Sequence, residues 1–227
     1  IHVTLYSPGY ASIISPQPIT RDTAVERKIQ ALPEVVSMSA YAIRPAIMNA
    51  NQLMEGIQLK GVDKDYDFTT IAAQPIDFKD TAYSKEVILS KTTLNRLHLK
   101  KGDEMLLYFI DGNSTFPRIR KVIVGGAYHT GMEDIDLNYA LCDIRLLQRI
   151  NQWSSDQVNG YQLTLSDADL SRGTADKIFE EILPRTTQLV ASTMQDIFPG
   201  IFDWLGLLDT NAVVVLVIMA IVAIINL

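Results

Sequence analysis

The chain has 227 residues, of which 48% are hydrophobic, and it carries a formal net charge of −6. This length and apolar content suit one large domain or two small ones. Lys and Arg nowhere gather into a stripe, which excludes a typical nucleic-acid-binding protein. The single cysteine, Cys142, has no partner for an internal disulfide, so we expect it to be a small buried residue in a fold held by its core.

The first sixty residues predict a β-α-β-β unit. The alternation of residues 1–6 is typical of a strand, and the stretch rich in Pro, Gly and Ser that follows predicts a loop. Thr23 and Glu26 have capping-box spacing at the start of a helix that should end at Pro33. The runs "EVVSMSAYAIRPAIM" and "LMEGIQLKGVD" then predict a hairpin across "NANQ".

A second unit, from about Tyr83, predicts a small and mostly antiparallel β structure. Its expected strands are "EVILS", "EMLLYFI", "FPRIRKVIVGGAY" and "YALCDI", and its expected helices are "KTTLNRLHL" and "RLLQRIN". Pro117 suggests that the third strand lies at an edge, because proline cannot donate to a ladder. Gly125 and Gly126 suggest a bulge in the same strand. The segment "HTGMEDIDLN" is expected to be a solvated loop.

The last third predicts another β-α-β unit, from "VNGYQLTLS" to "TQLVAS". Between these strands, residues 170–183 predict an amphipathic helix, with Ala175, Ile178, Phe179 and Ile182 on one face. The order indicates an α+β fold in which the first and last parts share one subdomain and the middle part is inserted. The expected boundaries are 1–76 and 157–200 for the shared subdomain, 77–156 for the insertion, and 201–227 for a junction and the start of a transmembrane helix.

The end of the chain is apolar, since all 14 side chains from Ala212 to Ile225 are hydrophobic. A membrane span needs roughly 20 such residues, but a core helix would show a polar face, and this run shows none. The flank after Arg185 holds only acidic charges, as expected outside the cytoplasm. We therefore expect the outer segment between two membrane helices, with its two ends close together. A packing helix in a soluble domain is the alternative.

No motif for catalysis or for a cofactor occurs in the sequence. The GxxxxGK[ST], GxGxxG, HExxH, CxxC and GxSxG patterns are all missing, and His2, His98 and His129 are far apart. The acidic segment at His129–Asp136 lacks the spacing of a calcium loop. We expect no catalytic residue, no cofactor and no metal, and hence no enzyme.

Four segments in the same order resemble the extracytoplasmic domain of MacB-type ABC transporter permeases, which are FtsX-like permeases with a MacB-type periplasmic core domain. They are "LKGVDKDYD", "EVILSKTTLNRLHLKKGDEMLLYF", "KVIVGGAYHTGMEDIDLNYALCDIRLLQRI" and "DIFPGIFDWLGLLDTNAVVVLVIMAIVAIINL". The bulky last run is closer to the lipoprotein-releasing permeases LolC and LolE than to efflux members, whose runs are rich in glycine. The resemblance implies a Porter-like subdomain from both ends of the chain and a Sabre-like inserted subdomain.

The resemblance also implies a function and partners. The chain would be the periplasmic domain of an inner-membrane permease subunit that couples cytoplasmic ATP hydrolysis to lipoprotein release. Its partners would be a cytoplasmic ABC ATPase, a second permease subunit of the same or a homologous kind, lipoprotein cargo and a periplasmic lipoprotein carrier. A MacB-type efflux or export domain and a periplasmic binding module without a transport role are the alternatives.

Two segments are candidate contact sites. In the LolC branch, an extended hairpin before the long Sabre strand binds the carrier. The resemblance makes Ser114, Phe116, Pro117, Arg118 and Arg120 of the shorter hairpin here candidates for the same contact, and an ordinary hairpin without this role is the alternative. The segment before the last apolar run is a candidate for contact with lipid or cargo because it is too apolar for a solvated linker. Its members are Phe198, Ile201, Phe202, Trp204, Leu205, Leu207 and Leu208.

Overall fold

The computed structural model describes residues 3–6, 17–71, 73–79, 82–110, 116–184, 189–197 and 199–225. The strands are β1 (Val3–Tyr6), β2 (Ile19–Thr20), β3 (Val35–Ala50), β4 (Leu53–Val62), β5 (Glu86–Ser90), β6 (Glu104–Phe109), β7 (Arg118–Tyr128), β8 (Tyr139–Asp143), β9 (Gln157–Val158), β10 (Gly160–Leu165) and β11 (Val190–Thr193). The α-helices are α1 (Thr23–Gln30), α2 (Lys91–Arg96), α3 (Glu133–Asn138), α4 (Ile144–Asn151), α5 (Ser171–Lys177), α6 (Met194–Ile197) and α7 (Pro199–Ile225). Single turns of other helix types are η2 (Thr69–Ile71), η3 (Ala168–Leu170) and the π-helical η4 (Ile178–Ile182).

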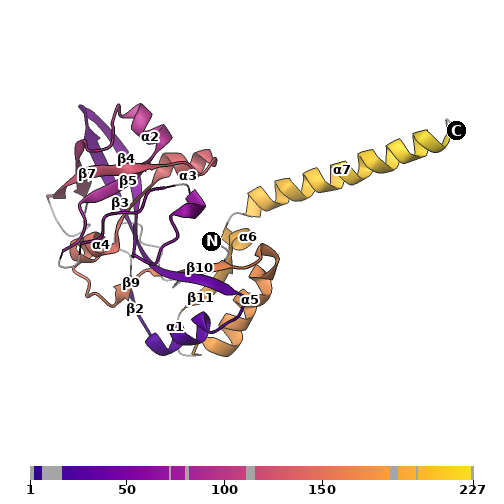
Figure 1. The fold of residues 1–227 in the computed structure, drawn as a ribbon, viewed down its shortest axis with the longest axis horizontal. Helices are drawn as coiled ribbons and strands as arrows, with labels where there is room; N and C mark the ends of the chain where they lie inside the picture. The colour runs from indigo at the N-terminus through magenta and orange to yellow at the C-terminus, as the bar shows by residue number, and fades with distance from the viewer. Residues whose placement is uncertain are drawn as a thin grey trace.

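One nine-stranded sheet runs through the fold in the order β11-β1-β10-β3-β4-β8-β5-β7-β6. The long strand β3 pairs with β10 along its first half and with β4 along its second half. β6 also pairs with β3, so the strands β3, β4, β8, β5, β7 and β6 close into a ring. Figure 1 shows the ring strands at one end of the molecule and β10, β11, α1 and α5 at the other. The expected mixture of helices and a sheet-rich core is confirmed.

Alternation along the strands divides the open part of the sheet, β11-β1-β10-β3, into two faces. Val3, Leu5 and Leu163 are fully buried in the same core as Ile29 of α1 and Ile178 of η4. The residues between them in each strand point to the opposite face. That second face is turned away from α1 and η4 and becomes the floor of the groove described below.

The hairpin and the bulge expected from the sequence are both confirmed. β3 pairs with β4 up to Ala50 and Leu53, and Asn51 and Gln52 between them have positive φ angles of 50° and 65°, as a tight two-residue turn requires. In the β5–β7 ladder, Val87 pairs with Val124 and Ile88 with Gly126, which leaves Gly125 as the extra residue.

The helix α1 begins one residue earlier than the capping-box spacing implied. Asp22 is the N-cap, and its Oδ1 accepts hydrogen bonds from the amides of Ala24 at 2.8 Å and Val25 at 3.3 Å. Glu26 does not reach back to the cap, because Arg21 and Tyr161 both donate hydrogen bonds to its carboxylate.

Three further expectations need correction. β7 is an edge strand only over its first part, because Arg118–Val122 pair with β6 alone, whereas β5 also pairs with β7 from Ile123 onward; Pro117 lies just before this ladder. The helix over residues 170–183 changes to a π-helical turn at Ile178, which rotates Phe179 out of the buried face and leaves it 53% exposed. The segment expected to be a solvated loop contains α3, in which Asp136 is buried.

The expected closeness of the two ends of the domain is confirmed by a strand pair. β1 and β11 run antiparallel, with Val3 opposite Thr193. α6 and α7 follow β11, and α7 projects away from the rest of the molecule (Figure 1). Among the residues searched, which are those that the structure describes, no helix is long and apolar enough to cross a membrane.

Candidate functional site

A groove of about 710 Å³ lies over the face of the open sheet that is turned away from α1 and η4. Its floor is formed by side chains that share this face, namely Thr4 and Tyr6 of β1, Ser37, Ser39, Tyr41 and Ile43 of β3, and Gln162 and Thr164 of β10. The register explains why these residues meet, because Gln162 lies opposite both Thr4 and Ser39. The floor is therefore rich in hydroxyl groups.

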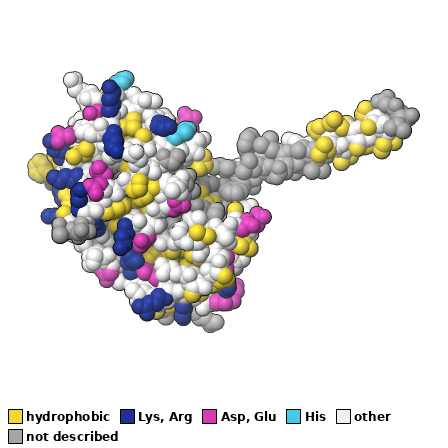
Figure 2. Space-filling view, in the orientation of Figure 1, with side chains coloured by type: hydrophobic (Ala, Val, Ile, Leu, Met, Phe, Trp, Pro, Cys, Tyr) yellow, Lys and Arg dark blue, Asp and Glu magenta, His cyan; other side chains and the backbone are white. Residues whose placement is uncertain are grey.

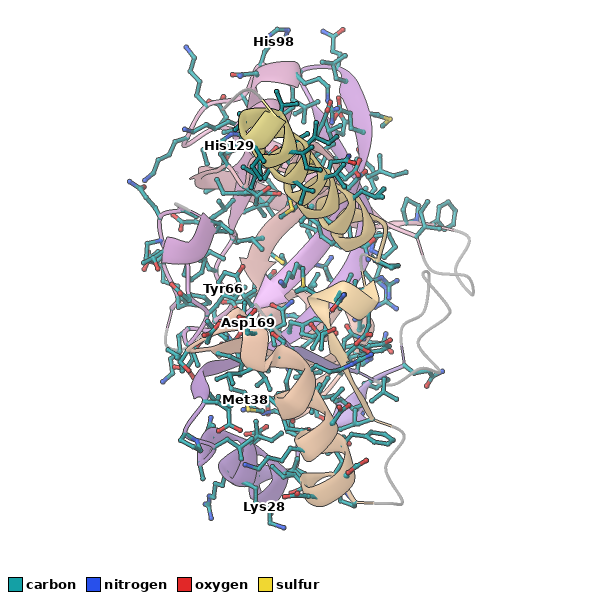
Figure 3. All side chains as sticks on the ribbon, turned by 90° about the vertical axis from the view of Figure 1, so that its right-hand side faces the viewer. Lys28, Met38, Tyr66, His98, His129 and Asp169 are labelled. Carbon is teal, nitrogen blue, oxygen red and sulfur yellow. The ribbon has the colours of Figure 1, made fainter. Side chains whose placement is uncertain are left out.

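The walls of the groove come from four other parts of the chain. They are Lys60 of β4; Tyr66, Asp67 and Ile71 of the segment after it; Tyr128, Thr130, Met132, Ile135, Tyr139 and Leu141 from β7 to β8; and Met194, Asp196 and Ile197 of α6. In Figure 3, Tyr66 lies between His129 above and Met38 below, at mid-height of the molecule. The walls are mostly apolar or aromatic, unlike the floor.

Lys60 is the basic residue of this groove, and it is 91% buried. Its Nζ lies 5.4 Å from the centre of the Tyr66 ring and 6.0 Å from that of Tyr41, within the range of cation–π contacts. Among the described residues, no carboxylate forms an ion pair with it. Burial lowers the pKa of Lys60 from 10.5 to about 7.

A second polar group in the groove lacks a partner. The Oε1 atom of Gln162 is buried and accepts no hydrogen bond from the residues that the structure describes. Buried side-chain oxygens usually have a partner, so an unpaired one in a groove indicates a place where a ligand or water would bind. Lys60 and Gln162 lie on the same face, because Lys60 is opposite Ile43 and Gln162 is opposite Ser39 of the same strand.

The wall near α3 is held by Asp136. Its carboxylate accepts hydrogen bonds from the Thr130 amide at 3.0 Å and the Thr130 hydroxyl at 2.8 Å, and it lies 2.7 Å from His129 Nδ1. Burial alone would raise the pKa of Asp136, but these hydrogen bonds outweigh it and lower the pKa below its usual value. His98 lies away from this cluster at the top of Figure 3, and no group of metal-binding residues occurs in the described chain.

The hairpin proposed for carrier contact is partly described, since Ser114 lies outside the described residues. Phe116 is 79% exposed, and Pro117 is exposed beside it. Arg118 is tied into the fold, because its Nη1 donates a hydrogen bond to the carbonyl of Ile150. Arg120 donates a hydrogen bond to its neighbour, the carbonyl of Ile119, at 2.9 Å.

The surface around this hairpin is both apolar and charged. Ile110 and Ile119 are about half exposed, and Phe116 is more exposed than either. Lys121, which follows Arg120 by one residue, forms an exposed ion pair with Glu104 at 2.6 Å. Figure 2 shows Lys and Arg mixed with Asp and Glu on the face turned to the viewer, so the basic groups there form no continuous stripe.

The segment proposed for lipid or cargo contact is described least. Phe198 and the side chains of Ile201, Phe202, Trp204, Leu205 and Leu208 lie outside the described part, whereas Leu207 is 62% exposed. The backbone from Pro199 onward is a single helix, so Pro199 and Gly200 stand in its first turn. Proline suits this position, because its missing N–H would have no partner there.

The groove was not among the sites predicted from the sequence. One signal was present, since Lys60 interrupts the otherwise mostly apolar end of β4, and charged residues are rarely buried without a partner. The alternating hydroxyl residues of β1, β3 and β10 were a second signal. Only the register of these strands brings the two signals to one face.

Comparisons with known proteins place the fold. The sequence matches no family model and no curated protein. The structure is similar to the extracellular domain of the noncanonical ABC-type transporter YknZ from Gram-positive bacteria, with 14% identity, a TM-score of 0.53, and coverage of 86% of this chain and 100% of that one. It is also similar to the periplasmic region of MacB from Actinobacillus actinomycetemcomitans, with 9% identity, a TM-score of 0.55, and coverage of 88% and 91%. The chain thus has the fold of the extracytoplasmic domains of these transporters.

Proposed function

We propose that the chain is the extracytoplasmic domain of one permease subunit of an ABC transporter. Such a domain has to receive motion from membrane helices at its ends, and rigid-body motion needs both ends to enter one mechanical unit. The pairing of β1 with β11 is the observation that carries this proposal, because it joins the first and last strands directly. The fold similarity to YknZ and MacB supports the same assignment.

The proposal includes a division of the chain and a membrane connection. Residues 1–76 and 157–200 would form the Porter-like subdomain, from which the second half of β3 and β4 extend into the ring, residues 77–156 the Sabre-like insertion, and 201–227 the junction and the start of a transmembrane helix. α7 is a candidate for that helix because its side chains from Val214 to Ile224 are all apolar and all exposed. The membrane would be the inner membrane, with this domain in the periplasm.

The transported substrate defines two candidate functions. Lipoprotein release is the first, on the resemblance of the last apolar run to LolC and LolE. MacB-type efflux or export is the second, and the similarity to the periplasmic region of MacB favours it. In both, a cytoplasmic ATPase subunit hydrolyses ATP, a second permease subunit completes the transporter, and this chain itself is not an enzyme.

Reconstitution of the whole permease with its ATPase in proteoliposomes distinguishes the two functions. If the function is lipoprotein release, lipoprotein should leave the bilayer for a soluble carrier when ATP is added. An ATPase with an inactivated catalytic site should abolish this transfer. Retention of lipoprotein together with ATP-driven export of soluble compounds would establish the efflux function instead. If neither lipoprotein nor a soluble compound is moved when ATP is added, the permease assignment is wrong.

The proposed cargo segment is tested in the same system. A photo-crosslinker at Leu207, whose side chain is exposed, should form adducts with lipoprotein that disappear during ATP turnover. The same crosslinker at Val217, further along α7 and also exposed, should give adducts with phospholipid. Phospholipid adducts alone at both positions would assign the segment a role in anchoring only.

A further inference from the structure

We propose that the groove is a binding site for a small anionic amphiphile, with its acidic head group on the Lys60 ammonium and its apolar part along the groove walls. The inference goes beyond transport, because it assigns the domain a ligand of its own. It rests on three features of the groove. Within the described part of the chain, the cation of Lys60 has no acidic partner and the amide oxygen of Gln162 has no donor, and the groove is divided into a polar floor and apolar walls.

The first feature sets the charge of the ligand. Lysine is almost never buried without a partner, and Lys60 is 91% buried, with its Nζ near the rings of Tyr41 and Tyr66. Among the described residues its Nζ has neither a hydrogen bond nor an ion pair. A bound anion would supply the missing partner, and the low polarity of the site would strengthen that contact.

The second feature sets the polar chemistry beside the charge. The unpaired Oε1 of Gln162 needs a donor, which a hydroxyl or amide of a head group can supply. The hydroxyl groups of Thr4 and Ser39 stand on either side of Gln162 in the register and can donate or accept. A head group with one anionic centre and neighbouring hydrogen-bonding atoms fits this floor.

The third feature indicates that the ligand is larger than its head group. A volume of about 710 Å³ lies well within the range of sites for organic ligands, and a bare phosphate would fill little of it. Ile71, Leu141, Met194 and Ile197 line the walls and would bury an acyl chain. Asp67 and Asp196 line the groove as well and disfavour a ligand with several negative charges.

Titration calorimetry on the full chain, with no ATPase present, tests the proposal. The probe is dihexanoyl phosphatidylglycerol below its micelle concentration, and the matched probe is dihexanoyl phosphatidylcholine, which has the same chains and no net charge. Octanoate tests a free fatty acid as the source of the anion, and inorganic phosphate tests a head group without a chain. We expect the phosphatidylglycerol, octanoate or both to bind at least tenfold more tightly than the other two probes.

Variants locate the binding. Lys60→Met should weaken binding of the anionic amphiphile at least tenfold, and Lys60→Gln should do the same if the methionine variant does not fold. Lys64→Met removes an equal charge from an exposed position four residues away and should bind like the parent chain. Because α7 is the same in the parent chain and in all variants, any binding of the probe to α7 is common to them and does not affect the comparison.

Two results would overturn the inference. One is equal affinity of the parent chain and both Lys60 variants for the anionic amphiphiles. The other is binding of inorganic phosphate as tight as that of the amphiphiles, which would describe a simple anion site. Because the measurement uses no ATPase and no transport, its failure leaves the permease proposal untouched, and failure of transport leaves this binding site untouched.

Discussion

Asp136 connects the groove wall to the ring through both its side chain and its carbonyl. The carboxylate accepts the hydrogen bonds from Thr130 and His129, and the carbonyl accepts hydrogen bonds from the hydroxyl groups of Ser90 and Thr93. Ser90 is also the N-cap of α2. This one residue therefore holds α3 against the start of α2.

Replacing Asp136 should be costly for stability. In Asp136→Ala the amide and hydroxyl of Thr130 lose their buried acceptor, so we expect the free energy of unfolding to fall by about 1–3 kcal/mol in urea denaturation. Asp134→Ala, at an exposed position on the same helix, should change it by less than about 0.5 kcal/mol. The stabilisation by the Asp136 carboxylate should be present above its unfolded pKa and be lost as the pH falls through its lowered folded pKa. Equal effects of the two substitutions would contradict this role.

Lys60 should make the stability of the ligand-free chain depend on pH. The unfolded chain binds a proton at Lys60 up to a pKa near 10.5, whereas the folded chain releases it at about 7. Between these values the unfolded state holds more protons, so the free energy of unfolding rises with pH. Tyr66 in the same groove does not titrate in this window, because burial raises its pKa to about 12.

The variant Lys60→Met lacks this titration and isolates the effect. At pH 7.5 it should be more stable than the parent chain, and the difference should shrink by about 2 kcal/mol when the pH is raised to about 9. Urea denaturation of both proteins at the two pH values measures the change. A difference that is independent of pH would mean that Lys60 is charged in the folded groove.

At the scale of elements, the bulge in β7 depends on a glycine. A Cβ atom at Gly125 would lie 2.8 Å from Glu86 Cβ and 3.1 Å from its Oε2, closer than such atoms normally approach. Glu86 cannot easily move, because its Oε2 accepts a hydrogen bond from the Asp77 amide at 2.9 Å. The neighbour Gly126 has room, since the nearest atom to its Cβ position is Gln74 Cβ at 3.9 Å.

We expect the same substitution to have different effects at these two glycines. Gly125→Ala should lower the free energy of unfolding by about 1–3 kcal/mol through overpacking, and Gly126→Ala should change it by less than about 0.5 kcal/mol. Thermal denaturation followed by circular dichroism compares them. If Gly126→Ala proves the more harmful, the bulge has been assigned to the wrong residue.

The hairpin before β7 offers a test of the carrier contact. Arg120 is the suitable position, because Arg118 is bonded to the Ile150 carbonyl and its replacement would disturb the fold. If an acidic carrier binds here, Arg120→Glu should slow association by roughly three- to tenfold at low salt, and added salt should reduce the difference. Stopped-flow mixing measures the rate. Arg27→Glu, exposed on α1, is the matched control. If both substitutions slow association equally, the effect comes from the net charge of the chain and not from a contact at the hairpin.

At the scale of the whole molecule, β11 and α7 contribute differently to the fold. β11 pairs with β1 along its whole length, and Thr193 is buried. α7 projects away from the domain in Figure 1. The edge of the sheet therefore depends on β11.

Two truncations separate these contributions. Ending the chain after Ile197 removes α7 and should shift the midpoint of thermal unfolding by less than about 2 °C. Ending it after Pro184 also removes β11 and α6, leaves β1 without its outer neighbour, and should lower the midpoint by more than about 5 °C. A large drop on removal of α7 alone would show that this helix packs on the domain.

The sequence by itself determined the features that depend on neighbours in the chain. The α1 helix follows from local apolar spacing, the β3–β4 hairpin from its turn residues, and the bulge from Gly125 and Gly126. The order of strands and helices also indicated the α+β class. These predictions succeed because short-range geometry has few solutions and the residue types select among them.

Tertiary structure alone decided the features that need contacts between distant segments. The closing of the ring by β6 on β3, the parallel pairing of β8 with β4 and the burial of Asp136 all join parts that no local pattern relates. The groove is of the same kind, because Lys60, Tyr66 and Gln162 come together only through strand register. A strand shows in its sequence which residues share a face, but the partner strands decide whether that face meets helices, solvent or a ligand.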